Sequence, residues 1–341
     1  LSAWTATGDT GHVWAGQYAG YAWPMAPWFT AGDALGLPVW LVHRLWLGTL
    51  LALAAVGVVG ALVLAGCAGV DAPNRSDAAD VAGPSNVAGS AAGDLAELPS
   101  SHVHAITVNP KDDQVYLATH DGLFIAGADG WTARGPNVDL MGFTVADSDH
   151  FYASGHPGEG TDLPSPVGLI ESRDGGTTWT SLSRGGQSDF HTLTTSSGGI
   201  AGFDGQLRVS PDGTDWETGT GLRAAAFSLA GGENGAVLAT TELGLSASID
   251  AGATWALVDN APLMLLVAWA AGETVAGIEP DGTVHVSTDG GRTWQERGQV
   301  EGQPEALGAT GSGDELRILA VAGGSISESR DAGATFEDLQ P

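Results

Sequence analysis

The residues of this sequence that are best suited to chemistry are histidines, and they gather in one part of the chain. Seven of the nine histidines follow residue 100. A neutral imidazole binds divalent metals, and its charge changes near neutral pH, so clustered histidines can hold a cation or act as a titrating site. The candidate ligand-binding residues are His102, His104, His120, His156, Asp189, His191, Arg223 and Glu305. The candidate metal ligands among them are His104, His120, His156 and His191.

A repeated motif indicates which elements must position these residues. The pattern S-x-D-x-G-x-T-[WF] begins at Ser172, Ser248, Ser287 and Ser329, and a form shortened by one residue begins at Ser210. Successive serines are 38, 38, 39 and 42 residues apart. Each unit of this length carries four strand-like stretches separated by turn residues, a pattern typical of the blades of a β-propeller.

The motif itself predicts a turn between two strands. An aspartate can accept backbone N–H groups in such a turn, glycine supplies backbone geometry that other residues avoid, and the closing aromatic residue anchors neighbouring sheets. We therefore assign structural roles to the five motif aspartates, which are Asp174, Asp212, Asp250, Asp289 and Asp331.

In this motif, residues 101–341 resemble the Asp-box (bacterial neuraminidase repeat) propeller families, which include sialidases, some glucanases, sortilin-like receptors and photosystem assembly factors. The strings ATHDGLF, ASGHPG and GLIESRDGGTTW are similar to a bacterial Asp-box lipoprotein family described as glycosylhydrolase-like. The resemblance implies an all-β fold. We predict six blades, at about residues 102–138, 139–187, 188–221, 222–261, 262–300 and 301–341, the last closed by its own outer strand at 336–339.

Alignment of the innermost strands places the candidate site on one face. The turns between strands one and two and between strands three and four share one end of a blade, so the motif turns occupy that end and the candidates the other. The aligned positions are His104, Met141, His191, Ala225, Leu265 and Glu305, and those two residues earlier are His102, Asp139, Asp189, Arg223, Leu263 and Gln303. Because strand side chains alternate, both sets should face the mouth of the central channel.

Several functions are compatible with such a face. The first is binding of a ligand, either a glycan or a protein, with or without a divalent metal. A further possibility is that these side chains only line a polar channel filled with water. The alternative is a glycoside hydrolase that uses carboxylates of this face, taken from Asp139, Asp189, Glu242, Glu279 and Glu305. The arginine triad and late tyrosine nucleophile of the sialidase family are not found, so sialidase activity is not expected.

Charge and composition exclude other classes. The formal net charge is −28, and a strongly negative surface repels nucleic-acid phosphates. The single cysteine, Cys67, excludes a disulfide framework within the chain and any site built from several thiolates. Nucleic acid is therefore not an expected partner.

The first hundred residues predict a membrane anchor. We divide them into an atypical segment at 1–44, an apolar signal or transmembrane helix at 45–67 and a flexible linker at 68–100 that is rich in Ala, Gly, Ser, Asp and Pro. Residues 45–66 contain no charge and are long enough to span a bilayer. Arg44 before them and aspartates after them place the later residues outside the cell. The Leu64-Ala65-Gly66-Cys67 sequence resembles a bacterial lipobox, which implies lipidation of Cys67.

Residues 11–50 carry a second resemblance. Their YxWPMxPxF and LGLPxWxxxRLW pieces are similar to the first periplasmic loop and following membrane segment of actinobacterial arabinofuranosyltransferases. Those enzymes need many membrane spans, so transferase activity is not expected from one. The first residue is Leu rather than Met, which suggests a truncated or fused reading frame, and the resemblance leaves an inverted orientation of the apolar segment open.

Overall fold

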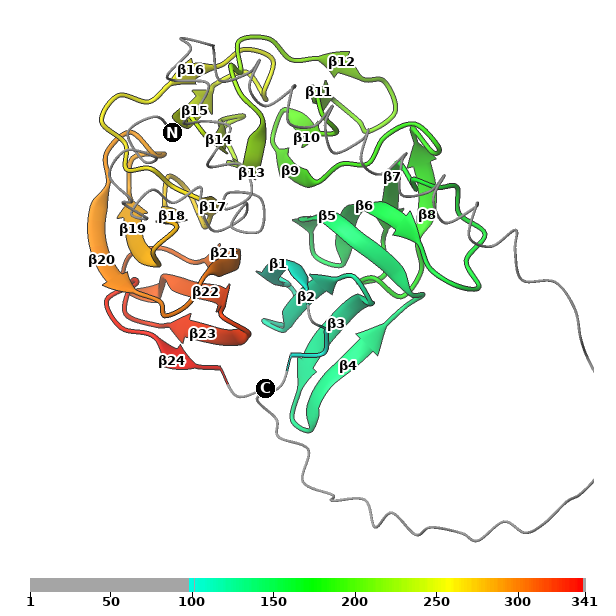
Figure 1. Cartoon of the computed structure of the whole chain (residues 1–341), viewed down its shortest axis with the longest axis horizontal. Helices are drawn as coiled ribbons and strands as arrows, with labels where there is room; N and C mark the ends of the chain where they lie inside the picture. The colour runs from blue at the N-terminus through cyan, green and yellow to red at the C-terminus, as the bar shows by residue number, and fades with distance from the viewer. Residues whose placement is uncertain (1–97, 101, 340–341) are drawn as a thin grey trace, which may run out of the picture. The chain divides into compact units, whose positions relative to one another are not determined.

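The computed structural model describes residues 98–100 and 102–339, and these residues form a propeller of six four-stranded sheets (Figure 1). In every sheet the strands follow chain order and pair antiparallel with their neighbours. The first strand of each sheet lies nearest the centre in Figure 1, and the fourth lies at the periphery. The all-β class and the six predicted blades are confirmed, while the predicted segments 1–44, 45–67 and nearly all of 68–100, with Cys67, lie outside the described residues.

The strand bounds agree with the blade boundaries expected from the repeat. The first three blades contain β1 (Val103–Val108), β2 (Val115–Thr119), β3 (Gly122–Gly127), β4 (Gly130–Arg134), β5 (Val138–Asp147), β6 (His150–Pro157), β7 (Leu169–Ser172), β8 (Thr180–Ser183), β9 (Thr192–Ser196), β10 (Gly199–Phe203), β11 (Leu207–Ser210) and β12 (Glu217–Thr218). The last three contain β13 (Ala226–Gly231), β14 (Val237–Thr241), β15 (Gly244–Ser248), β16 (Ala256–Leu257), β17 (Leu266–Trp269), β18 (Val275–Ile278), β19 (Thr283–Ser287), β20 (Gln295–Gln299), β21 (Pro304–Thr310), β22 (Arg317–Ala322), β23 (Ser325–Ser329) and β24 (Glu337–Asp338), with a 3-10 turn, η2, at Gly313–Glu315. Within these described residues no helix is long and apolar enough to cross a membrane.

Apolar side chains fill the seams between neighbouring blades. The core divides into six clusters, and each cluster joins two blades that are adjacent in the ring. The cluster at the closing seam packs Val103 and Leu117 of blade one against Leu319 and Val321 of blade six. Blade six completes its sheet with β24, as expected, so this seam is closed by packing rather than by exchange of a strand. All of these contacts lie in one compact unit that begins at residue 91, so a fragment of residues 91–341 retains the complete ring.

Four of the repeated motifs form the same turn, and the shortened motif at Ser210 forms a turn that is one residue tighter. In each motif the serine hydroxyl accepts a hydrogen bond from a glycine N–H at 2.8–2.9 Å, and a threonine hydroxyl donates to the aspartate. Hydrogen bonds from the Thr335 hydroxyl and backbone lower the pKa of Asp331 to about 2. The motif aspartates thus accept hydrogen bonds within their own turns, and their structural role stays a prediction.

Candidate functional site

The motif turns and the candidate site lie at opposite ends of the blades. In three blades the N–H of a motif residue donates to a carbonyl in the turn between the first two strands, as Gly175 does to Asp149, Ala251 to Gly235 and Gly290 to Glu273, each at 2.9 Å. The motif turn and the turn between the first two strands therefore lie at the same end of a blade and are held together. The starts of the innermost strands and the ends of the second strands lie at the other end, where the sequence placed the histidines.

His104 owes its orientation to a β-bulge. The register between β1 and β2 shifts between Val103 and Ala105, which leaves His104 without a cross-strand partner. A bulge re-aims the side chain of the extra residue, and here the bulged residue lies on the wall of the central channel. Corresponding bulges occur at Met141 of β5, at Phe227 of β13 and at Glu305 of β21.

Four bulge residues, together with His191, which aligns with them but has no bulge, surround the mouth of the channel. His104, Met141, His191, Phe227 and Glu305 all line the same cavity. Two imidazoles and a carboxylate therefore share one opening with two apolar side chains. In this ring the fourth blade contributes Phe227, whereas the sequence alignment had placed Ala225 there.

This difference corrects the position of Arg223. Arg223 precedes the bulge residue of its blade by four positions rather than two, and it does not line the channel. Its side chain is exposed. The connection from β12 to β13 is longer than the alignment assumed, so Arg223 is not part of the ring. Glu305 is in the ring, as predicted.

Blade one and blade two meet at a cluster of three histidines and one aspartate, which we call the first cluster: His102, His104, His120 and Asp139. The Nδ1 of His120 lies 2.8 Å from Oδ1 of Asp139, and the Nε2 of His104 lies 3.7 Å from the same oxygen. The ring centroids of His104 and His120 are 4.5 Å apart, and that of His102 is 5.1 Å from that of His120. The backbone N–H of His120 donates to the carbonyl of His102 at 3.4 Å, which ties the end of β2 to the start of β1.

The environment of His104 favours its neutral form. Burial lowers its pKa to about 4, and the positive charges that His120, His102 and His191 can carry add to this effect, while Asp139 opposes it. Its side chain is 18 % exposed. His104 therefore presents an uncharged imidazole to the channel at neutral pH.

Blade two and blade three meet at a second cluster, His156, Asp189 and His191. The Nε2 atoms of His156 and His191 lie 3.2 and 3.0 Å from the same oxygen of Asp189. Asp139 and His156 are cross-strand partners in β5 and β6, so the two clusters are joined through blade two. Gly155 makes this arrangement possible: its φ of +144° suits glycine, and a Cβ there would collide with the carbonyl oxygen of Asp139.

The structure thus brings the predicted histidines together, but as two clusters rather than one set. His104 and His120 share Asp139, and His156 and His191 share Asp189, so the four predicted metal ligands do not converge on a single point. Asp139 was predicted to face the channel but not named as a ligand. The signal that identifies it is its aligned position, two residues before the ring residue of its own blade.

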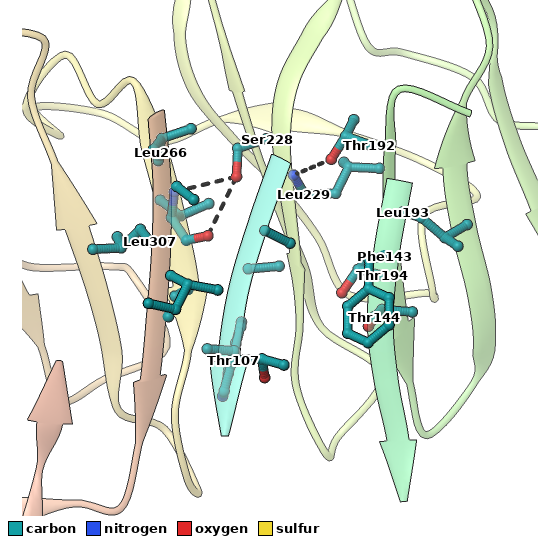
Figure 2. A pocket seen from close by; sticks show the side chains of 18 of the residues that line it. Thr107, Phe143, Thr144, Thr192, Leu193, Thr194, Ser228, Leu229, Leu266 and Leu307 are labelled. Atoms are coloured by element: carbon teal, nitrogen blue, oxygen red, sulfur yellow. Dashed lines mark hydrogen bonds between the residues drawn. The ribbon is translucent and has the colours of Figure 1, made fainter. Parts of the chain in front are cut away.

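Below the mouth, the channel wall consists mainly of small hydroxyl side chains and aliphatic residues on the inner strands (Figure 2). The hydroxyls also join neighbouring blades. Thr192 accepts a hydrogen bond from the N–H of Leu229 at 3.0 Å, and the Ser228 hydroxyl contacts the backbone N–H and carbonyl of Val267 at 3.3 Å (Figure 2). These hydrogen bonds join neighbouring blades along the wall. The titratable side chains of the two histidine clusters lie at the mouth.

Two further histidines pair with carboxylates outside these clusters. The Nε2 of His285 lies 2.7 Å from Oε1 of Glu279, and the Nε2 of His150 lies 2.8 Å from Oε1 of Glu171. The sequence treated His150 and His285 as exceptions to the face and did not predict either pair. His285 is nearly buried, in β19, and reaches Glu279 in the turn before its own strand.

Two parts of the chain match protein-family models. Residues 1–78 match the model for an alpha-(1->3)-arabinofuranosyltransferase N-terminal GT-C domain, which confirms the resemblance in residues 11–50 and extends it. Residues 285–296, which contain Asp289, match the BNR/Asp-box repeat model. No curated protein matches the chain significantly.

Solved structures of the same fold are distant in sequence. A chain of a nidogen/laminin complex aligns with a TM-score of 0.52 and 12 % identity, over 67 % of this chain and 93 % of that one. The protein YCF48 from Cyanidioschyzon merolae aligns with a TM-score of 0.46 and 15 % identity, over 71 % and 86 %. An ancestral GH74 enzyme aligns with a TM-score of 0.45 and 17 % identity, over 69 % of this chain and 36 % of the enzyme.

Identities this low show a shared fold and nothing more. The motif geometry and the six closed sheets identify the architecture of the described residues. The described residues form a six-bladed β-propeller that carries an Asp-box repeat, and residues 1–78 match the model for the N-terminal GT-C domain of an arabinofuranosyltransferase.

Proposed function

We propose that this protein is a membrane-associated, extracytoplasmic binding propeller whose channel mouth binds a glycan. The observation that carries the proposal is the ring at the mouth, in which His104, His191 and Glu305 share one opening with Met141 and Phe227. Ligand sites combine apolar surface with a few converging polar groups, and this ring has both. Sugars suit such a surface because they offer hydroxyls to the polar groups and C–H faces to the apolar ones.

Binding fits the carboxylates better than hydrolysis does. A glycosidase needs two carboxyl groups that flank the scissile bond, one of them free to give up a proton and the other to attack or to activate water. Of the five carboxylates considered for this role, Asp139, Asp189 and Glu279 each contact an imidazole. No described observation favours the hydrolase, so the glycan-binding function is the one we propose.

The segment before the propeller supports both the location and the first ligand to test. Residues 1–78 match a domain of a membrane-embedded transferase class, and residues 45–66 are apolar throughout. A spanning helix or an acyl chain on Cys67 would hold the propeller at the outer face of the membrane. The matched model is that of an arabinofuranosyltransferase, so an arabinofuranose polymer is the first glycan to test.

The proposal is tested with the propeller fragment, residues 91–341, on an array of arabinan oligosaccharides and other envelope glycans. We expect one class of glycan to bind, and His191→Ala and Glu305→Ala each to weaken its binding about tenfold, the effect of losing one hydrogen bond of about 1.4 kcal/mol. Glu296→Ala, on the exposed outer strand β20, is the control and should bind as the unaltered fragment does.

Three results would contradict glycan binding at this mouth. The first is the absence of binding to every glycan, and the second is equal binding by the two mouth variants and the control. The third is capture of a protein ligand through the same ring with no glycan bound.

A further inference from the structure

We propose that His104, His120 and Asp139 bind a divalent transition-metal ion of the zinc type, with His102 as the fourth ligand. Among the described residues these three form the one group in which single donor atoms from three metal-binding side chains lie within 4.8 Å of one another. Two imidazoles and a carboxylate form a donor set that zinc uses in proteins. The inference does not depend on the proposed glycan function, because the ion would bind with or without a sugar.

The distances fit a tetrahedral ion. Zinc lies about 2.0–2.1 Å from nitrogen and oxygen donors, so two donors on a tetrahedral ion are about 3.3 Å apart. The two donor separations to Oδ1 of Asp139, 2.8 Å from His120 and 3.7 Å from His104, lie on either side of this value. Shifts of about half an ångström in exposed or half-buried side chains would bring both separations to it.

His102 is placed to complete the coordination. The same geometry puts the ring centroids of two imidazoles on one ion about 5 Å apart. The centroid of His102 lies 5.1 Å from that of His120 and 6.3 Å from that of His104. Its side chain is exposed, and its backbone is held beside the end of β2 by the hydrogen bond from His120, so its ring can turn toward the ion without movement of a strand.

The donor atoms lack other partners. The Nε2 of His104 and the Oδ1 of Asp139 are both buried and without a hydrogen-bond partner, so the short approach of His120 to this oxygen does not have hydrogen-bond geometry. Buried polar atoms in proteins are nearly always satisfied, and an unsatisfied pair that faces the same point calls for an explanation. A cation at that point would satisfy both atoms at once.

Other histidine–carboxylate contacts in the described chain do not share this arrangement. His150 with Glu171 and His285 with Glu279 are single pairs in hydrogen-bond geometry. In the second cluster, His191 is hydrogen-bonded to Asp189. These contacts supply matched controls of the same residue types.

The test is isothermal titration of zinc chloride into the fragment of residues 91–341, freed of any histidine tag and treated with EDTA followed by dialysis. We expect one ion per chain. His120→Ala and Asp139→Asn should each weaken binding by at least about 100-fold, the upper end of the loss seen for groups that only support a ligand. His150→Gln, which removes an imidazole paired with Glu171 at the other end of the blades, should leave affinity unchanged within about twofold.

Two variants keep the test informative if one fails to fold. Asp139→Asn retains the shape of the side chain, and His120 is 42 % exposed, so its removal leaves no core cavity. Tryptophan fluorescence of each variant verifies the fold. Absence of zinc binding by the unaltered fragment would overturn the proposal. So would variants His120→Ala and Asp139→Asn that both bind zinc as tightly as the unaltered fragment does. A loss of affinity in His156→Ala or His191→Ala but not in His120→Ala would also overturn it.

Discussion

Replacement of His104 by glutamine should alter the pH dependence of stability in a calculable way. Burial lowers the pKa of His104 from 6.5 to about 4, with help from His120, His102 and His191 and against the effect of Asp139. The unfolded chain therefore takes up a proton at this residue before the folded chain does. Acidification favours unfolding, and the stability associated with neutral His104 is complete above pH 6.5 and lost as pH falls toward 4.

The size of the effect follows from the shift. One pKa unit corresponds to about 1.36 kcal/mol, so a change from 6.5 to about 4 corresponds to about 3 kcal/mol of unfolding free energy over that pH interval. The side chain is only 18 % exposed, so solvent screening removes little of this. Glutamine at position 104 is polar and cannot titrate, and the surrounding groups are the same in both proteins.

The assay is urea unfolding of residues 91–341 followed by tryptophan fluorescence, with EDTA present, at several pH values between 4 and 7. We expect the unfolding free energy of the unaltered protein to fall by about 3 kcal/mol more than that of His104→Gln over this range. Parallel pH profiles of unfolding free energy for the unaltered protein and His104→Gln would contradict this prediction. So would an NMR titration in which the ring of His104 protonates near pH 6.5.

Three further predictions concern the ring, the motif turn and the anchor. Gly308→Ala places a Cβ against the carbonyl oxygen of Ile106 at the closing seam and should lower stability by about 1–3 kcal/mol in thermal unfolding. Gly127→Ala is the control and should not lower it, because the nearest atom to its Cβ would be the Gly130 carbonyl oxygen at 3.4 Å. Equal unfolding midpoints of the two variants would be inconsistent with tight contact at the seam. Asp289→Ala removes hydrogen bonds from the Arg292 N–H and from Thr293 and should lower the unfolding free energy by about 1–3 kcal/mol. Asp215→Ala is the control and should lower it little. Similar losses in the two variants would argue against a structural role for the motif aspartate. Cells fed an alkyne fatty acid should label the full chain but not Cys67→Ser, and failure of the unaltered chain to take up label would exclude the lipid anchor.

Most of the fold could be predicted because the motif turn is local and recurs. The serine, aspartate, glycine and threonine of a motif bond to one another within a few residues, so their spacing in the sequence specifies the turn. Recurrence at nearly constant spacing then requires equivalent blades, and the blade boundaries follow. The closure of blade six by its own strand followed in the same way, from the sequence after the last motif.

The candidate site was predicted less completely, because its contacts cross from blade to blade. His104 and Asp139 belong to different blades, and no alignment of repeats shows which side chain of one blade reaches the next. Arg223 was misplaced because alignment without a structure does not reveal that a bulge at Phe227 begins the inner strand of its blade. The division of the histidines into two clusters likewise depends on contacts between neighbouring blades.

Anomalous diffraction at the zinc edge tests directly whether the histidines at the channel mouth form a metal-binding site. The crystals are of residues 91–341, grown with zinc chloride. We expect a peak between Nε2 of His104, Nδ1 of His120 and Oδ1 of Asp139. A difference map without a peak there, or with its strongest peak beside Asp189 or among the motif turns, would contradict it.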